Sequence, residues 1–91
     1  MTTYVLSFEL NEDYNQDDLF EELAALGEAK QGLASTWFLK SEQTATEIRD
    51  SLSVHLAPDE RLLVVKSSAP AAWRNLTCDN RWLIDNISNK N

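Results

Sequence analysis

Few residues in this sequence have side chains of the types that usually support catalysis. His55 is the only histidine and Cys78 the only cysteine. A histidine base needs a nucleophile or a phosphate within reach, and none of its sequence neighbours supplies one. The nearest bases to the cysteine along the chain are Arg74 and Arg81, so we interpret Cys78 as an unreactive thiol and His55 as a surface or helix-end residue. A single cysteine also excludes an intrachain disulfide and a zinc site built from thiolates.

Three tryptophans, Trp37, Trp73 and Trp82, are the other conspicuous residues. Indole rings can stack on nucleic-acid bases, but such sites also need clustered lysine and arginine. The bases here are spread along residues 30–90 and form at most a weak basic edge. Three tryptophans in so small a domain are more typical of a core or of an interface between subunits.

Glu9 lies near the end of residues 2–10, where apolar and polar side chains alternate. A period of two predicts a β-strand whose more apolar side faces the core. Glu9 then shares the opposite side with Val5 and Ser7. The alternation alone predicts that Glu9 is a carboxylate at the end of a strand, on the face that points away from the core.

Strands and helices alternate along the rest of the chain. The apolar spacing predicts one α+β domain over residues 1–87, with a frayed tail at 88–91. The helix that begins near residue 44 starts with a capping box formed by Thr44 and Glu47. The expected elements are strands at 2–10, 32–40 and 61–66, helices at 15–26 and 44–56, a short helix within 67–73, and a final strand or helix at 81–87.

The second predicted strand has an aromatic residue on each of its faces. Trp37 and Phe38 are adjacent, so they point to opposite sides of the sheet. Two helices can cover only one face of an antiparallel sheet, which leaves the other face open in a monomer. We therefore expect a homodimer whose interface contains Val5, Ser7, Trp37 and Phe38.

Acidic residues are concentrated at one end of the chain. The net charge is −7, and residues 1–28 hold eight acids and no lysine or arginine. The predicted helix at 15–26 ends at Gly27, expected in a left-handed conformation. Three interpretations stay open for the acids: solubility, a basic protein partner, or imitation of nucleic acid. The acids that lie away from the apolar stripe of this helix are Asp17, Asp18, Glu21 and Glu22.

Length and composition limit the class of protein. The chain has 91 residues, of which 43% are hydrophobic and 25% charged, as expected for one globular domain. Its longest aliphatic run, residues 62–65, is far shorter than the roughly 20 residues that cross a membrane. The N-terminus has no targeting pattern, and with one cysteine we expect a cytoplasmic protein without a membrane partner.

Several motifs in this order resemble the SinR-like small proteins of the CRISPR-associated Cas-two-like superfamily. The resemblance covers most of residues 3–84, and each motif is weak when taken alone. A further likeness lies in Ala72-Trp73 followed by Trp82-Leu83. The principal motifs are Thr3-Tyr4-Val5-Leu6-Ser7-Phe8-Glu9-Leu10, Ser35-Thr36-Trp37-Phe38-Leu39-Lys40, Ile48-Arg49-Asp50 with Leu52, and Asp59-Glu60-Arg61-Leu62-Leu63-Val64-Val65.

The resemblance implies a ferredoxin-like βαββαβ fold, with two helices on one face of the sheet, and a homodimer formed sheet against sheet. In metal-dependent relatives an aspartate from each subunit lies near the dimer axis, and Glu9 is at the matching position. The longer glutamate arm departs from that pattern, and magnesium demands strict geometry. Relatives include nucleases, toxins or antitoxins, and assembly subunits.

Three functions are therefore carried forward. The first is a nucleic-acid-associated, antitoxin-like or assembly module with little or no catalysis. The second is an endonuclease or ribonuclease that uses Glu9 with magnesium or manganese. The third is an acidic decoy, or a binder of a basic protein through the helix at 15–26.

Overall fold

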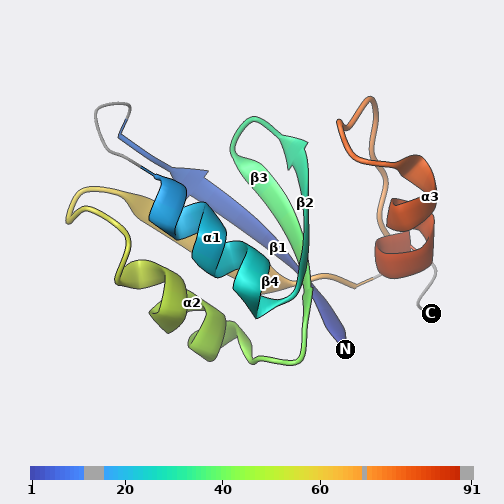
Figure 1. Ribbon diagram of the computed structural model, residues 1–91. Helices are drawn as coiled ribbons and strands as arrows, with labels where there is room; N and C mark the ends of the chain where they lie inside the picture. Colours follow the sequence, from blue (N-terminus) through green and yellow to red (C-terminus); the bar gives the residue numbers. More distant parts are fainter. Residues whose placement is uncertain (12–15, 69, 89–91) are drawn as a thin grey trace.

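The computed structural model describes residues 1–11, 16–68 and 70–88. Within these ranges four strands form one antiparallel sheet in the order β2-β3-β1-β4 (Figure 1). The α+β class expected from the sequence is confirmed. The strands are β1 at Thr2–Glu9, β2 at Glu28–Leu33, β3 at Thr36–Ser41 and β4 at Arg61–Lys66.

Strand β1 is central and sets the register of its two neighbours. Val5 lies opposite Phe38 of β3 and opposite Val65 of β4. Because side chains alternate along a strand, these three residues lie on one face of the sheet. The side chains of Tyr4, Leu6 and Phe8 point to the other face.

Two helices cover that other face, as expected (Figure 1). They are α1 at Asp17–Leu26 and α2 at Ala45–Ser53. Helix α2 begins with the predicted capping box: the Glu47 amide donates to Thr44 Oγ1 at 3.1 Å, and the Thr44 amide donates to Glu47 Oε1 at 2.8 Å. Sheet and helices bury a common core of Tyr4, Leu6, Phe8, Leu19, Leu23, Leu39, Ile48 and Leu52.

The second face of the sheet is not left open along its whole length. Residues 67–88, here called the C-terminal segment, continue past β4. They cover part of the second face of the sheet (Figure 1). This segment contains the short helix α3 at Asn80–Leu83 and a π-helical turn at Ile84–Ser88. Phe38 is buried there against Leu83 and Ile87. The expectation of a fully open second face is therefore wrong: part of it is core.

The predicted strand at 32–40 is in fact a hairpin of two strands. Its turn falls at Ala34 and Ser35, between β2 and β3. Gly32 of β2 faces the Phe38 ring, and an added Cβ would lie 2.5 Å from a ring carbon. The glycine expected at the start of a strand instead leaves room for the Phe38 ring to pack over β2.

Other expectations needed smaller corrections. Gly27 ends α1, but its φ of 163° is extended backbone and not left-handed. Glycine fits there because an added Cβ would collide with the Lys40 carbonyl. The short helix within 67–73 is absent from the described part of that range, residues 67–68 and 70–73. The final element is helical, and α2 ends at Ser53. The predicted tail at 88–91 and the start of the helix at 15 fall outside the described residues, apart from the backbone of Ser88.

None of the helices in the described ranges is both long enough and apolar enough to cross a membrane.

Because the C-terminal segment packs on the sheet, substitutions at two adjacent residues should lower the free energy of unfolding by different amounts. Leu83 is fully buried, whereas 39% of Ile84 is exposed. We expect Leu83→Ala to lower the free energy of unfolding by about 2–5 kcal/mol because it opens a cavity above Phe38. Ile84→Ala should cost less than about 1 kcal/mol. Urea denaturation followed by tryptophan fluorescence measures both. Equal, small losses would mean that the segment does not pack on the sheet.

Candidate functional site

Glu9 is the last residue of β1, and the register places it opposite Arg61, the first residue of β4. The Arg61 guanidinium donates from Nη1 to Glu9 Oε1 at 2.8 Å. Both side chains are largely exposed, 69% for Glu9 and 79% for Arg61. The candidate carboxylate is therefore half of a cross-strand ion pair at the end of the sheet (Figure 1).

In the described part of a single chain, this arrangement gives a divalent metal no complete set of ligands. Magnesium takes several hard oxygen ligands in near-ideal octahedral geometry. Among the described residues, no group of three or more histidine, cysteine, aspartate or glutamate side chains could hold a metal ion. The resemblance implies a site shared by two subunits, where Arg61 would compete with a metal for the exposed Glu9 carboxylate.

Two other acids in the described residues near this end of the sheet, Asp59 and Glu60, have structural partners. Glu60 accepts hydrogen bonds from the backbone amides of Asn11, at 2.6 Å, and Ala57, at 2.7 Å. Asp59 accepts from the side-chain amide of Asn11 at 2.8 Å. These bonds tie the end of β1 to the turn before β4. The acids here therefore hold two loops together and do not converge with Glu9.

Ser7 is exposed on the same face as Glu9, opposite Leu63 of β4. Leu63 is 56% exposed, and Val65, two residues on, is 42% exposed. Ser7, Leu63 and Val65 form an uncovered apolar surface, here called the β4 strip. The sequence analysis singled out Ser7 but not Leu63 or Val65. The alternation within residues 61–66 was the signal that could have found them.

The two aromatic residues expected at a dimer interface lie on opposite faces of the sheet. Trp37 is on the helical face, where its ring stacks on Phe20 with centroids 5.4 Å apart and planes at 29°. Phe38 is on the opposite face, buried beneath the C-terminal segment with Val5 packed against it. Of the four predicted interface residues, Ser7 alone is fully exposed on the uncovered part of the second face.

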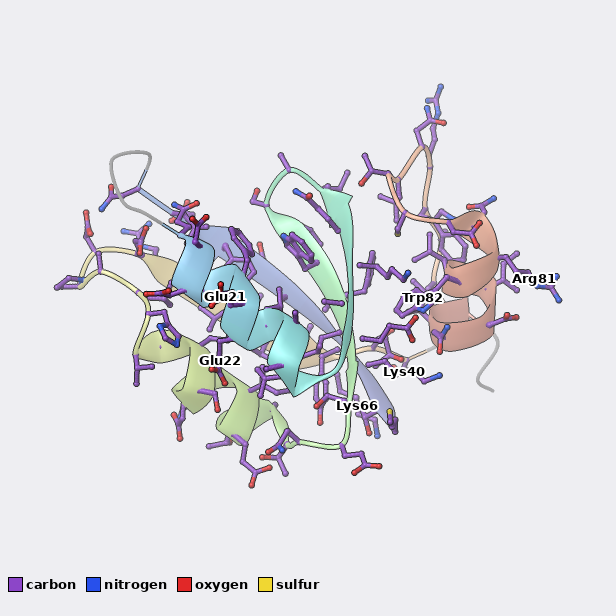
Figure 2. All side chains as sticks on the ribbon, viewed as in Figure 1. Glu21, Glu22, Lys40, Lys66, Arg81 and Trp82 are labelled. Atoms are coloured by element: carbon purple, nitrogen blue, oxygen red, sulfur yellow. The ribbon has the colours of Figure 1, made fainter. Side chains whose placement is uncertain are left out.

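The acids of α1 differ in their surroundings. Asp17, Asp18 and Glu21 are exposed. Glu22 is only 34% exposed, and its Oε1 lies 3.8 Å from Nε2 of His55, at the end of α2. The two side chains therefore lie between the helices, close enough for an ion pair when His55 is protonated. Figure 2 shows Glu21 and Glu22 on α1, on the side of the molecule away from the C-terminal segment.

Several cations lie toward the C-terminal segment. Figure 2 shows Lys40 near that segment and Lys66 at the end of β4, with Arg81 beyond them on α3. Arg81 is within 3.6 Å of Asp85. Lys40, Lys66 and Arg74 have no ion pair within residues 1–11, 16–68 and 70–88. These three cations are thus separated along the molecule from the acids of α1.

Cys78 lies in the C-terminal segment and is partly buried. Burial raises the pKa of the Cys78 thiol above its ordinary value. A thiol with a raised pKa is protonated at neutral pH, and the protonated form is a poor nucleophile and a poor metal ligand. The structure therefore agrees with the interpretation of Cys78 as unreactive.

The chain matches no protein-family model, no curated protein and no solved structure. The resemblance to the SinR-like proteins therefore rests on the short motifs, which lie in β1, in the hairpin and β3, in α2 and in β4.

The two neighbouring glutamates of α1 offer a matched test of the contact with α2. We expect Glu22→Gln to lower the free energy of unfolding by up to about 1 kcal/mol, because it removes the charge that faces His55. Glu21→Gln should have no measurable effect, because no partner for Glu21 is found among the described residues. Thermal unfolding of the two variants separates them. An equal response of both variants would contradict the pairing.

Proposed function

We propose that this protein is a homodimeric, Cas-two-like module with a ferredoxin-like fold that binds nucleic acid without cleaving it. The observation that carries the dimer is the β4 strip, since no element among the described residues covers it. The observation that argues against cleavage is the ion pair between Glu9 and Arg61. The separation of charge supports an anionic partner on the side of the C-terminal segment.

The order of the strands supports the ferredoxin-like assignment. The chain runs β1-α1-β2-β3-α2-β4, and the antiparallel sheet has the order β2-β3-β1-β4 with α1 and α2 on one face. In a split β-α-β arrangement, a helix connects two parallel strands that have a third strand between them. Here α1 connects β1 to β2 with β3 between them, and this matches that arrangement.

The β4 strip supports a second copy of the chain as the partner. Strand β4 is at an edge of the sheet, so its outer backbone groups have no neighbouring strand. A free edge beside exposed aliphatic side chains is a template for pairing with another chain. Leu63 and Val65 lie on β4 itself, so one partner strand could pair with the edge and cover both side chains. Two copies meeting there by two-fold symmetry would use the same surface twice.

The Glu9–Arg61 pair supports binding without catalysis. A nuclease that uses a metal needs carboxylates free to bind it and to activate a water molecule. Glu9 instead neutralises a guanidinium at 2.8 Å. The neighbouring acids Asp59 and Glu60 are occupied by Asn11 and by backbone amides. The residues present are suited to holding the end of the sheet together.

The cations that lack ion pairs support nucleic acid as the anionic partner. Lys40 lies on the face of the sheet opposite the acids of α1, and Lys66 lies at the end of β4, where the C-terminal segment begins (Figure 2). Phosphate contacts with lysine release counterions and supply most of the affinity for nucleic acid without sequence preference. The acidic helix would then face away from the bound strand and avoid repulsion.

Dimerisation is tested by placing charge on the β4 strip. We expect the native protein to have about twice the 10.3 kDa mass of the chain in light scattering at micromolar concentration. Leu63→Lys should reduce the mass to that of a single chain, because a buried unpaired charge at an interface is very costly. The matched control is Val54→Lys, an exposed aliphatic residue at the end of α2, which should remain a dimer. A native monomer at high concentration, or a dimer that survives Leu63→Lys, would overturn the proposed interface.

Binding and cleavage are tested in one incubation with a labelled oligonucleotide. With millimolar magnesium or manganese at low salt, we expect the fluorescence anisotropy to rise while the strand stays full length. Lys40→Glu and Lys66→Glu should each weaken binding by about tenfold or more and reduce its dependence on salt. Arg49→Glu, which alters a cation that faces Asp50 on α2, is the matched control and should change little.

Two results would contradict the proposal in different ways. Shortening of the oligonucleotide that needs metal and disappears in Glu9→Gln would establish the nuclease hypothesis instead. Absence of any anisotropy change at low salt would remove nucleic acid as the partner while leaving the dimer intact.

A further inference from the structure

A pocket of about 540 Å³ lies between the second face of the sheet and the C-terminal segment. Its floor is formed by Val5 and Phe38 of the sheet, and its walls by Trp73, Leu76 and Ile87 of the segment. This volume is within the range of about 300–1,000 Å³ that is typical of pockets for small organic ligands. The pocket is far from Glu9 along β1 and does not include the β4 strip.

The charge around this pocket is unusual for so acidic a protein. Lys66 and Arg74 are the charged residues that line it, and no acid is found among the described lining residues. Neither cation has an ion pair among the residues that the structure describes. The hydroxyls of Ser67 and Ser68 add hydrogen-bond donors on the side of Lys66. The pocket therefore combines an apolar interior with the uncompensated positive charge of Arg74 at its margin.

Several hydrogen bonds hold the walls of the pocket in place. The Thr77 amide donates to the Gly32 carbonyl at 3.0 Å, and the Thr77 hydroxyl donates to the Gln31 carbonyl at 2.7 Å. Trp73 Nε1 donates to Asn80 Oδ1 at 2.7 Å, which fixes the orientation of the indole. The segment is thus anchored to β2, and the pocket exists before any ligand arrives. A preformed pocket loses less entropy on binding than one that must be assembled.

We propose that this pocket binds a small amphipathic carboxylate, a molecule with an apolar body of fatty-acid size and a single anionic group. The apolar body would lie on Val5, Phe38 and Leu76, and the carboxylate would contact Arg74. An arginine is well suited to this role because its planar guanidinium can donate two parallel hydrogen bonds to one carboxylate. The inference is independent of the proposed nucleic-acid function, because it rests on the shape and lining of the pocket.

Decanoate is the probe, and decanol, which has the same chain but no charge, is its matched control. Binding is followed by the fluorescence of the tryptophans, with Trp73→Phe identifying the signal from the pocket. We expect decanoate to bind at least about tenfold more tightly than decanol, since a hydrogen bond to a charged group contributes about 1.5–3 kcal/mol.

Substitutions then locate the site. Arg74→Gln should weaken decanoate binding by about tenfold and leave decanol binding unchanged. Ala72→Phe, which adds a ring to a residue that lines the pocket, should abolish binding of both. Lys40→Gln alters a cation outside the pocket lining and should bind decanoate as the native protein does. Far-ultraviolet circular dichroism confirms that each variant is folded.

Three results would overturn the inference. Equal affinity for decanoate and decanol would mean that Arg74 takes no part. Binding that survives Ala72→Phe would place the ligand elsewhere, with the β4 strip as the alternative apolar surface. Displacement of bound decanoate by an oligonucleotide, with loss of oligonucleotide binding in Ala72→Phe, would assign the pocket to nucleic acid.

Discussion

The structure depends on one constraint: a sheet that is apolar on both faces must have both faces covered. Strand β1 shows this requirement most clearly, because Leu6 belongs to the core beneath the two helices and Val5 packs against the core beneath the C-terminal segment. The two helices meet the requirement on the first face. On the second face the C-terminal segment reaches only part of the sheet, and buries Phe38 to 6% exposure while Leu63 stays 56% exposed. The pocket and the β4 strip are both consequences of this incomplete cover.

The parts of the fold that the sequence predicted well are those where a local pattern and the final packing agree. The alternation in residues 2–10, the apolar stripe of α1 and the capping box of α2 each define an element without reference to the rest of the chain. The β2–β3 hairpin was missed because its turn, Ala34-Ser35, lacks the glycine or asparagine that marks tight turns. Strand β2 is also polar along most of its length, and its place in the sheet depends on pairing with β3.

The C-terminal segment was hard to predict for a different reason. Its apolar residues, among them Leu76, Leu83 and Ile87, follow no long period, because the segment is mostly irregular and ends in short helical turns. What orders it is the sheet face beneath it, a contact between residues distant in sequence. The choice between strand and helix for residues 81–87 could not be made locally. The Asp79 side chain, which accepts from the Arg81 amide, was the available sign of a helix start.

Alternation alone placed Glu9 on the second face, but its partner could not be known without the register of β1 against β4. That register gives Glu9 a guanidinium and gives Ser7 an exposed leucine as neighbours. The ion pair stands at the uncovered end of the face, next to the β4 strip. A partner seated on the strip would therefore take water away from both charges together. Burying a matched pair costs much less than burying one charge alone, so Arg61 would contribute more to an assembled protein than to a single chain.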